Sequence, residues 1–138
     1  MNLTSLITDN ITEILIRIVK FTQSRQKILV QNIINIQSPG FVPRDLEVDE
    51  FSTVLNNAID EHVQNRHLLL YDTENIKFCT AGDLELRPIV DEHAEKLLEE
   101  DRDAYIEWQI DKLWENSLSQ KVATELLRQK VAAVQRNS

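Results

Sequence analysis

The chain has 138 residues and a formal net charge of −8, with 42% hydrophobic and 28% charged residues. This length corresponds to one domain, and a content of only two Gly and three Pro favours long helices over an all-β fold. No basic face suited to nucleic acid is visible, one cysteine excludes an intrachain disulfide, and no apolar run approaches the roughly 20 residues needed to cross a bilayer.

The charge is unevenly distributed along the chain. Residues 1–43 carry a net +2 and residues 117–138 a net +3, which leaves −13 for the segment between them. Two interpretations stay open: a solvated acidic surface, or a charge pattern that orders subunits in an assembly.

The start of the chain does not have the pattern of a signal peptide. Arg17 and Lys20 follow the first apolar residues instead of preceding them, and no small-residue cleavage site is present in residues 1–20. We therefore expect that any export uses a route without a cleaved signal.

Residues 10–36 are predicted to form a long amphipathic helix. Asp9 and Asn10 are candidate N-caps, because their side chains can accept hydrogen bonds from the free amides of the first turn. Pro39 and Gly40 should end the helix, since Pro39 disfavours a helical Ser38 and Gly40 can adopt a positive φ. The apolar side chains recur at spacings of three and four, which places them on one face: Ile7, Ile11, Ile14, Ile18, Phe21, Ile28, Leu29, Ile33 and Ile36.

The middle of the chain predicts a shorter helix and a small extended insert. Residues 46–64 form the helix, with Leu46, Val48, Phe51, Val54, Leu55 and Ala58 on its apolar side. Residues 67–71 and 75–80 are rich in aromatic, β-branched and leucine side chains, and residues 72–74 between them resemble a turn, which predicts a hairpin. Residues 81–83 form a second turn, and residues 84–86 a possible edge strand.

A second long helix is predicted over residues 89–135. Pro88 suits its first turn, and the charged residues 99–103 mark a possible break. The predicted fold is therefore mainly α: two long terminal helices forming an antiparallel coiled coil, with a shorter helix and a small β-hairpin insert between them. Residues 1–138 form one domain, helical over 10–64 and 89–136, with the insert at 65–88. Neither long helix can bury its stripe alone, so each packs on the other, on neighbouring molecules, or on both.

The sequence offers little that predicts catalysis. His62, His67 and His93 are scattered, and we expect each to be a surface or partly packed residue. Cys79 lies in an apolar run and is predicted to be a buried small side chain. Trp108 and Trp114 lie on nearly opposite sides of a helix, so at least one should be in a core or an interface. Two isolated glycines build no phosphate loop. We predict that the chain is not an enzyme and has no cofactor or metal.

The most specific pattern lies between residues 25 and 45. Asn32 and Asn35 lie on one side of the helix end, where their amides suit polar contacts to a neighbouring helix or to the turn. Gln31-Asn32-Ile33-Ile34-Asn35-Ile36-Gln37-Ser38-Pro39-Gly40-Phe41 resembles the N-terminal signature of flagellar axial proteins, a helix with Asn-x-x-Asn that ends in Thr-Pro-Gly-Tyr/Phe. Arg44-Asp45-Leu46, followed by Phe51 and Leu55, looks like the proximal rod protein branch of that family. Residues 106–118 and 124–132 are similar to the family's closing helix.

This resemblance covers residues 10–60 and 104–136 and implies a structural subunit of the bacterial flagellar basal-body rod. Its implied partners are other rod subunits, the rod–ring adaptor protein and the flagellar export gate, with self-association on assembly. The implied location is the periplasmic rod, reached by type III export from the cytoplasm, without direct membrane insertion and without nucleic acid. The residues expected to mediate assembly are Ile11, Ile14, Ile18, Asn32, Asn35, Pro39, Gly40, Phe41, Arg44, Leu113, Leu118, Leu126 and Leu127.

The alternative, from a different functional class, is a small soluble helical adaptor or regulatory binding protein. It would share the helical pattern by chance and work as a discrete monomer or dimer. A rod subunit should instead be a monomer when dilute and form larger species when concentrated.

Overall fold

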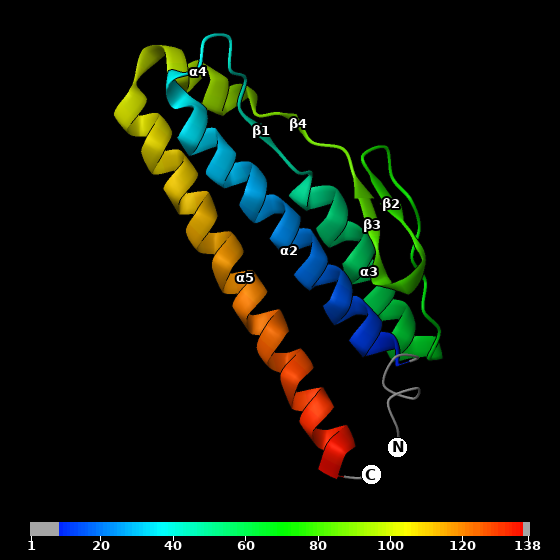
Figure 1. Cartoon of the computed structure of the whole chain (residues 1–138). Coiled ribbons are helices and arrows are strands. Elements are labelled where there is room, and N and C mark those ends of the chain that lie inside the picture. Colours follow the sequence, from blue (N-terminus) through cyan, green and yellow to red (C-terminus); the bar gives the residue numbers. More distant parts are fainter. Residues whose placement is uncertain (1–8, 137–138) are drawn as a thin grey trace.

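The structure is a computed structural model that describes residues 9–136, and it is mainly helical, as predicted (Figure 1). The predicted stripe residue Ile7 lies outside the described residues. The helices are α2 (Asn10–Ile34), α3 (Val48–Asn65), α4 (Glu92–Glu100) and α5 (Arg102–Arg136), and the short strands are β1 (Arg44–Asp45), β2 (Ile76–Phe78), β3 (Leu84–Leu86) and β4 (Ile89–Val90). No described helix is both long and apolar enough to pass through a membrane.

Helix α2 begins at Asn10, as predicted, and ends at Ile34, two residues before the predicted end. The Asp9 carboxylate accepts hydrogen bonds from the amides of Ile11 (2.8 Å) and Thr12 (3.0 Å), so Asp9, not Asn10, is the N-cap. After α2, a 3₁₀ turn over residues 35–37 leads to an extended Ser38 with φ −76° and ψ 126°. Gly40 has φ +72°, the left-handed conformation that glycine adopts at low cost. The Pro39-Gly40 turn therefore stops the helix and redirects the chain, as predicted.

The predicted hairpin between residues 67–71 and 75–80 is wrong in its pairing. Residues 67–71 form no strand, and β2 instead pairs antiparallel with β3, with Ile76 opposite Leu86 and Phe78 opposite Leu84. The physical reason is the turn between them: Ala81 and Gly82 both have positive φ (57° and 79°) and reverse the chain within a few residues.

The start of the last helical region also differs from the prediction. Residues after Pro88 do not enter a helix at once: Ile89 and Val90 form β4, which pairs antiparallel with β1. Helix α4 begins only after Asp91, whose carboxylate accepts from the Ala94 amide at 3.0 Å and caps it. The predicted break at residues 99–103 is confirmed, because Asp101 (φ −156°, ψ 96°) separates α4 from α5.

The main hydrophobic cluster lies on the α3 side of α2. It contains buried Ile14, Phe21, Leu46, Phe51, Leu55, Ala58 and Ile76. The rings of Phe21 and Phe51 are stacked with centroids 4.0 Å apart. No residue of α5 belongs to this cluster.

Helix α5 runs along the other side of α2 and in the opposite direction (Figure 1). Asn32, near the end of α2, contacts Gln109 near the start of α5, and Asp9 contacts Lys130 near the other end. The residues of α5 that are buried are Tyr105, Gln109, Asn116, Ala123 and Val134. Two of these five are amides, so this helix pair differs in character from the apolar packing between α2 and α3.

Candidate assembly interface

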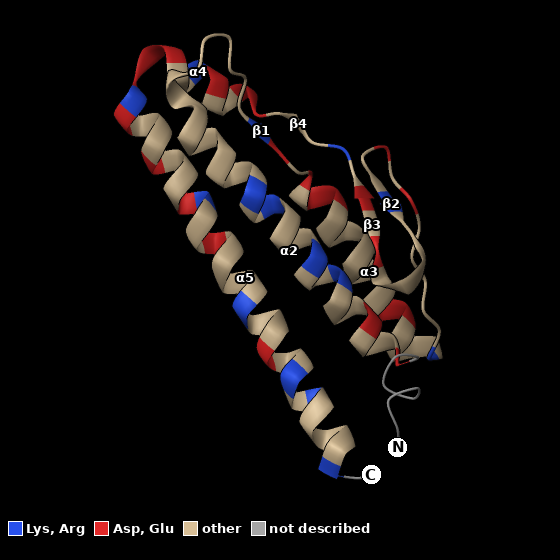
Figure 2. Cartoon of the chain, in the orientation of Figure 1, with Lys and Arg blue, Asp and Glu red and all other residues tan. Residues whose placement is uncertain are grey.

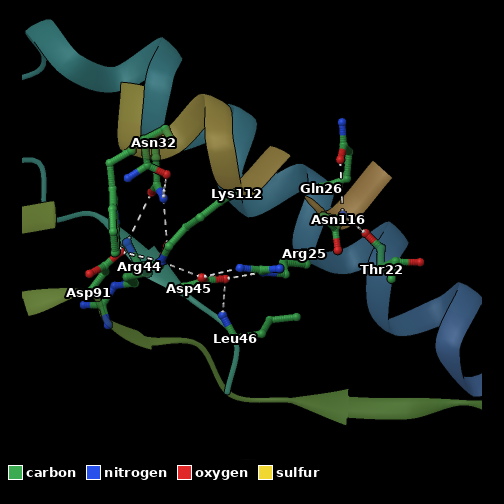
Figure 3. A network of polar contacts seen from close by, with 12 residues as sticks. Thr22, Arg25, Gln26, Asn32, Arg44, Asp45, Leu46, Asp91, Lys112 and Asn116 are labelled. Atoms are coloured by element: carbon green, nitrogen blue, oxygen red, sulfur yellow. Dashed lines mark hydrogen bonds and ion pairs between the residues drawn. The ribbon is translucent and has the colours of Figure 1, made fainter. Parts of the chain in front are cut away.

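The buried amides of α2 and α5 form a polar seam, defined here by Asn32, Gln109 and Asn116. Figure 3 shows Asn32 and Asn116 at the two ends of this seam. The Asn32 amide group donates to the Arg44 carbonyl (2.8 Å) and to Gln109 Oε1 (3.0 Å), while its oxygen accepts from the Arg44 amide (3.2 Å). The Tyr105 hydroxyl donates to the Asn32 carbonyl at 2.6 Å. Asn32 therefore joins α2 to β1 and to α5.

The seam continues two turns further along α5. The Asn116 amide group donates to the Thr22 carbonyl (2.8 Å) and to Gln26 Oε1 (3.2 Å) on α2. Because a buried amide loses about 1–3 kcal/mol when its partners are removed, the bonds of Asn116 and Asn32 favour one alignment of the two helices over shifted ones.

A buried ion cluster lies beside the seam (Figure 3). Arg25 of α2 makes two hydrogen bonds to Asp45 of β1, Nε to Oδ1 at 2.9 Å and Nη2 to Oδ2 at 3.0 Å. Lys112 of α5 contacts Asp45 Oδ2 at 2.9 Å and Asp91 Oδ2 at 2.7 Å, and Trp108 Nε1 donates to Asp91 at 3.0 Å. The cluster thus connects α2, β1, the N-cap of α4 and α5.

The ion pairs keep the two carboxylates charged. Burial alone raises the pKa of Asp45, but the hydrogen bonds and positive charges of Arg25 and Lys112 outweigh it, so the pKa lies below its usual value. Burial also raises the pKa of Asp91. The hydrogen bonds from Lys112 and Trp108 and the charge of Lys112 outweigh burial, so the pKa of Asp91 lies below its usual value. Burial, with a smaller effect of the Asp91 charge, raises the pKa of Tyr105 to about 12. Tyr105 therefore stays a neutral hydrogen-bond donor.

The apolar stripe of α5 is exposed to solvent. Trp114 is 74% exposed, Leu118 64%, Val122 51% and Leu126 45%. These side chains are four residues apart and lie along one side of the helix. We call Trp114, Leu118, Val122 and Leu126 the outer stripe. An exposed apolar line of this length is characteristic of an interaction surface.

The predicted assembly residues fall into three groups. Ile11, Ile14 and Ile18 pack with the α2–α3 hydrophobic cluster. Asn32 is buried in the seam, whereas Asn35 is only partly buried and donates to Gln31 on the same helix segment. The remaining residues are exposed or half-buried: Pro39, Gly40, Arg44, Leu118 and Leu126 are exposed, and Phe41, Leu113 and Leu127 are half-buried.

The three histidines and Cys79 are exposed or half-buried. His67 and His93 are exposed and His62 is half-buried, as predicted, with the His93 ring 4.4 Å from Trp108. Cys79 is half-buried, so the prediction of a buried thiol is wrong, because β2 ends at Phe78 and Cys79 starts the surface turn. Within residues 9–136, no group of three His, Cys, Asp or Glu side chains is placed to hold a metal ion.

The ion cluster and most of the seam are not predicted by the sequence patterns. The sequence distinguishes Asp45 only as part of the Arg44-Asp45 pair, yet Arg44 is exposed and Asp45 is buried. The seven-residue spacing between Gln109 and Asn116 was a usable signal, since it places both on one face of a helix. No protein-family model, curated protein or solved structure matches this chain.

Proposed function

We propose that this chain is a structural subunit of the bacterial flagellar basal-body rod, polymerising through its terminal helices. The observation that carries the proposal is the outer stripe: α5 directs its amides toward α2 and Lys112 toward β1, and it leaves Trp114, Leu118, Val122 and Leu126 exposed. Burying these side chains on assembly would gain about 25 cal/mol for each Å² of apolar surface removed from water.

The proposed function includes an antiparallel coiled coil of the two terminal helices. Its support is the spacing of the buried residues. On α2, Leu15, Thr22 and Leu29 recur every seven residues, as do Arg25 and Asn32; on α5, Gln109, Asn116 and Ala123 do the same. A repeat of seven keeps one face of each helix directed at its partner. Buried Asn residues within such a repeat fix register at some cost in stability.

The turn after α2 supports the same function. The Pro39-Gly40 turn returns the chain so that the backbone of Arg44 meets the Asn32 side chain at 2.8 and 3.2 Å. The direction in which the chain leaves α2 is thereby fixed by a proline, a left-handed glycine and two hydrogen bonds. A subunit repeated in a helical assembly needs this direction to be the same in every copy, because an angular error recurs at each copy.

The proposed partners are other rod subunits, the rod–ring adaptor protein and the flagellar export gate. The proposed location is the periplasmic rod, after type III export without a cleaved signal peptide. These assignments rest on the resemblance of residues 10–60 and 104–136 to flagellar axial proteins.

A helical adaptor is the second candidate, and the apolar trough between α3 and α5 favours it. The trough has a volume of about 520 Å³, and its walls include Leu55, Ile59, Leu118 and Val122, with Phe21 at its floor. A concave apolar surface of this kind suits a single bound segment, as an adaptor requires.

Sedimentation velocity and a swimming assay separate the two candidates. A rod subunit is expected to sediment as a monomer when dilute and as larger species when concentrated. Leu118→Ser combined with Leu126→Ser should abolish motility, because both residues belong to the outer stripe. Leu69→Ser is the matched control, because Leu69 is 42% exposed and does not line the trough. One fixed stoichiometry at all concentrations, or normal swimming of cells that lack the chain, would contradict the rod function.

A further inference from the structure

The helices α2, α3 and α5 occupy three corners of an incomplete four-helix bundle. Helix α2 lies between the other two (Figure 1), and both run opposite to it: Asp45, just before α3, meets Arg25, whereas Asn10 meets His62 near the end of α3. The trough between α3 and α5 lies where a fourth helix of such a bundle would pack. Helices α3 and α5 are parallel to each other.

The trough is elongated, and its two walls are formed by three consecutive turns of α3 and three of α5. Its lining runs from Val48 to Ile59 on α3 and from Glu115 to Leu126 on α5. At 1.5 Å per residue, each wall is about 16 Å long. The floor is formed by Leu15, Ile18, Phe21, Thr22 and Arg25 of α2. An elongated trough of this length matches the apolar face of three helical turns.

The polar groups at the floor are already satisfied. Arg25 binds Asp45 through two hydrogen bonds, and the Asn116 amide group donates to Thr22 and Gln26. A small polar ligand needs several convergent free donors or acceptors, whereas the polar wall residues Ser52, Asn56 and Ser119 are exposed and the rest of the lining is mainly apolar. An amphipathic helix needs only apolar contacts in the centre and charges at the edges.

The edges of the trough are predominantly acidic. Glu115 lines it. Asp49 and Asp60 are exposed on α3, three residues before the lining residue Ser52 and four after the lining residue Asn56, and Glu125 is exposed on α5 three residues after Val122. Residues at these spacings share a side of a helix. The basic side chains near these edges are Lys121 and Arg128, and Arg128 pairs with Glu125 at 3.2 Å. Figure 2 shows acidic residues at both ends of α3. Carboxylates therefore outnumber cations along the rim.

We infer that the trough binds one amphipathic α-helix of a different protein, with basic side chains flanking its apolar stripe. A second copy of this chain is disfavoured, because the basic side chains Arg17, Lys20 and Arg25 of its α2 already form ion pairs within its own fold. The chain as a whole carries a net charge of −8, which the acidic rim repels. Antiparallel alignment of dipoles orients the bound helix opposite to α3 and α5. The inference deepens the proposed function, since it names the partner class for the outer stripe and rests on that stripe as an assembly surface.

The test uses two labelled helical peptides of equal length with leucines on one face. In one peptide lysines flank the leucines, and in the other glutamates replace the lysines. Binding to the full chain is followed by fluorescence anisotropy at low and high salt. The lysine peptide should bind at least about tenfold more tightly than the glutamate peptide, and the difference should shrink as salt screens the charges.

Variants decide whether binding occurs in the trough. Val122→Asp and Leu118→Asp should each weaken binding of the lysine peptide by about tenfold or more, since each places a charge against the apolar face. Val63→Asp is the matched control, because Val63 is 64% exposed on α3 but does not line the trough. The Val63→Asp variant should bind the lysine peptide with the same affinity as the unsubstituted chain. Circular dichroism and urea unfolding confirm that all three variants fold.

Three results would overturn the inference. They are an absence of lysine-peptide binding, equal binding to the Val122→Asp and Val63→Asp variants, and self-association that Val122→Asp abolishes while the peptide does not bind. The last would make a second copy the occupant. Failure of the proposed rod function is seen separately, as normal swimming without the chain while peptide binding to the trough persists.

Discussion

Replacing Asp45 with Asn should destabilise the chain by about 3 kcal/mol. Asp45 Oδ2 accepts from Arg25 Nη2 and Lys112 Nζ, and an amide nitrogen at that position cannot. Each charge-assisted bond contributes about 1.5–3 kcal/mol, and breaking one side of a buried ion pair costs about 3–5 kcal/mol. The lower end applies here, because Lys112 retains Asp91 at 2.7 Å and the Asn oxygen can still accept from Arg25 Nε.

Urea unfolding at pH 7 measures this loss, which corresponds to a fall in melting temperature of about 10 °C for a chain of this size. Asp111→Asn is the control, because Asp111 is exposed on α5, and its effect should stay within about 0.5 kcal/mol. A loss below about 1 kcal/mol for Asp45→Asn would refute the assignment of the ion cluster as a main link between α2, β1 and α5.

The same variant predicts a change in the pH dependence of stability. Because the pKa of Asp45 is lowered in the folded state, its contribution is fully present above the unfolded pKa of about 3.9 and is lost as the pH falls through the folded pKa. The difference between the original chain and Asp45→Asn should therefore be constant from pH 7 to 5 and should shrink below about pH 4. If the difference in unfolding free energy already shrinks near pH 6, the Asp45 carboxylate is not its source.

Three further substitutions have expected outcomes. Gly82→Ala should cost about 2 kcal/mol in urea unfolding, because φ is +79° and the added methyl group would lie 2.6 Å from a side chain of α2; a neutral effect would contradict that packing. Tyr105→Phe should cost about 1–2 kcal/mol, since it leaves a buried main-chain acceptor on α2 unpaired, and thermal melts measure it. Pro39→Ala combined with Gly40→Ala should preserve helix content in circular dichroism yet block assembly and motility; full swimming would refute the role of this turn.

The long helices could be predicted because their signals are local. The Asp9 cap, the Pro39-Gly40 stop and the Asp101 break each depend on a few adjacent residues. Extended segments at 75–80 and 84–86 were also predictable, and they contain β2 and β3, but the strand pairing was not. The strands β1 and β4 have two residues each and pair across 43 intervening residues. Segments this short have no measurable periodicity.

The candidate interface was predictable only in part, because hydrophobicity alone misassigns the two sides of α5. A pattern of leucines and valines predicts the buried side of a helix, yet Leu118 and Val122 are exposed while Gln109 and Asn116 are buried. Amides become favourable inside only when specific partners such as Asn32 are in place, and those partners come from a distant part of the chain. Sequence composition does not record that pairing.

The junction at Asp101 has a consequence for exchange of helices between molecules. One non-helical residue separates α4 from α5. If its backbone became helical, residues 92–136 would form one continuous helix of about 67 Å. Helix α5 would then leave its own α2 and could pair with the α2 of another copy through the same amides, as in domain swapping. The main hydrophobic cluster would stay intact, because it contains no residue of α5.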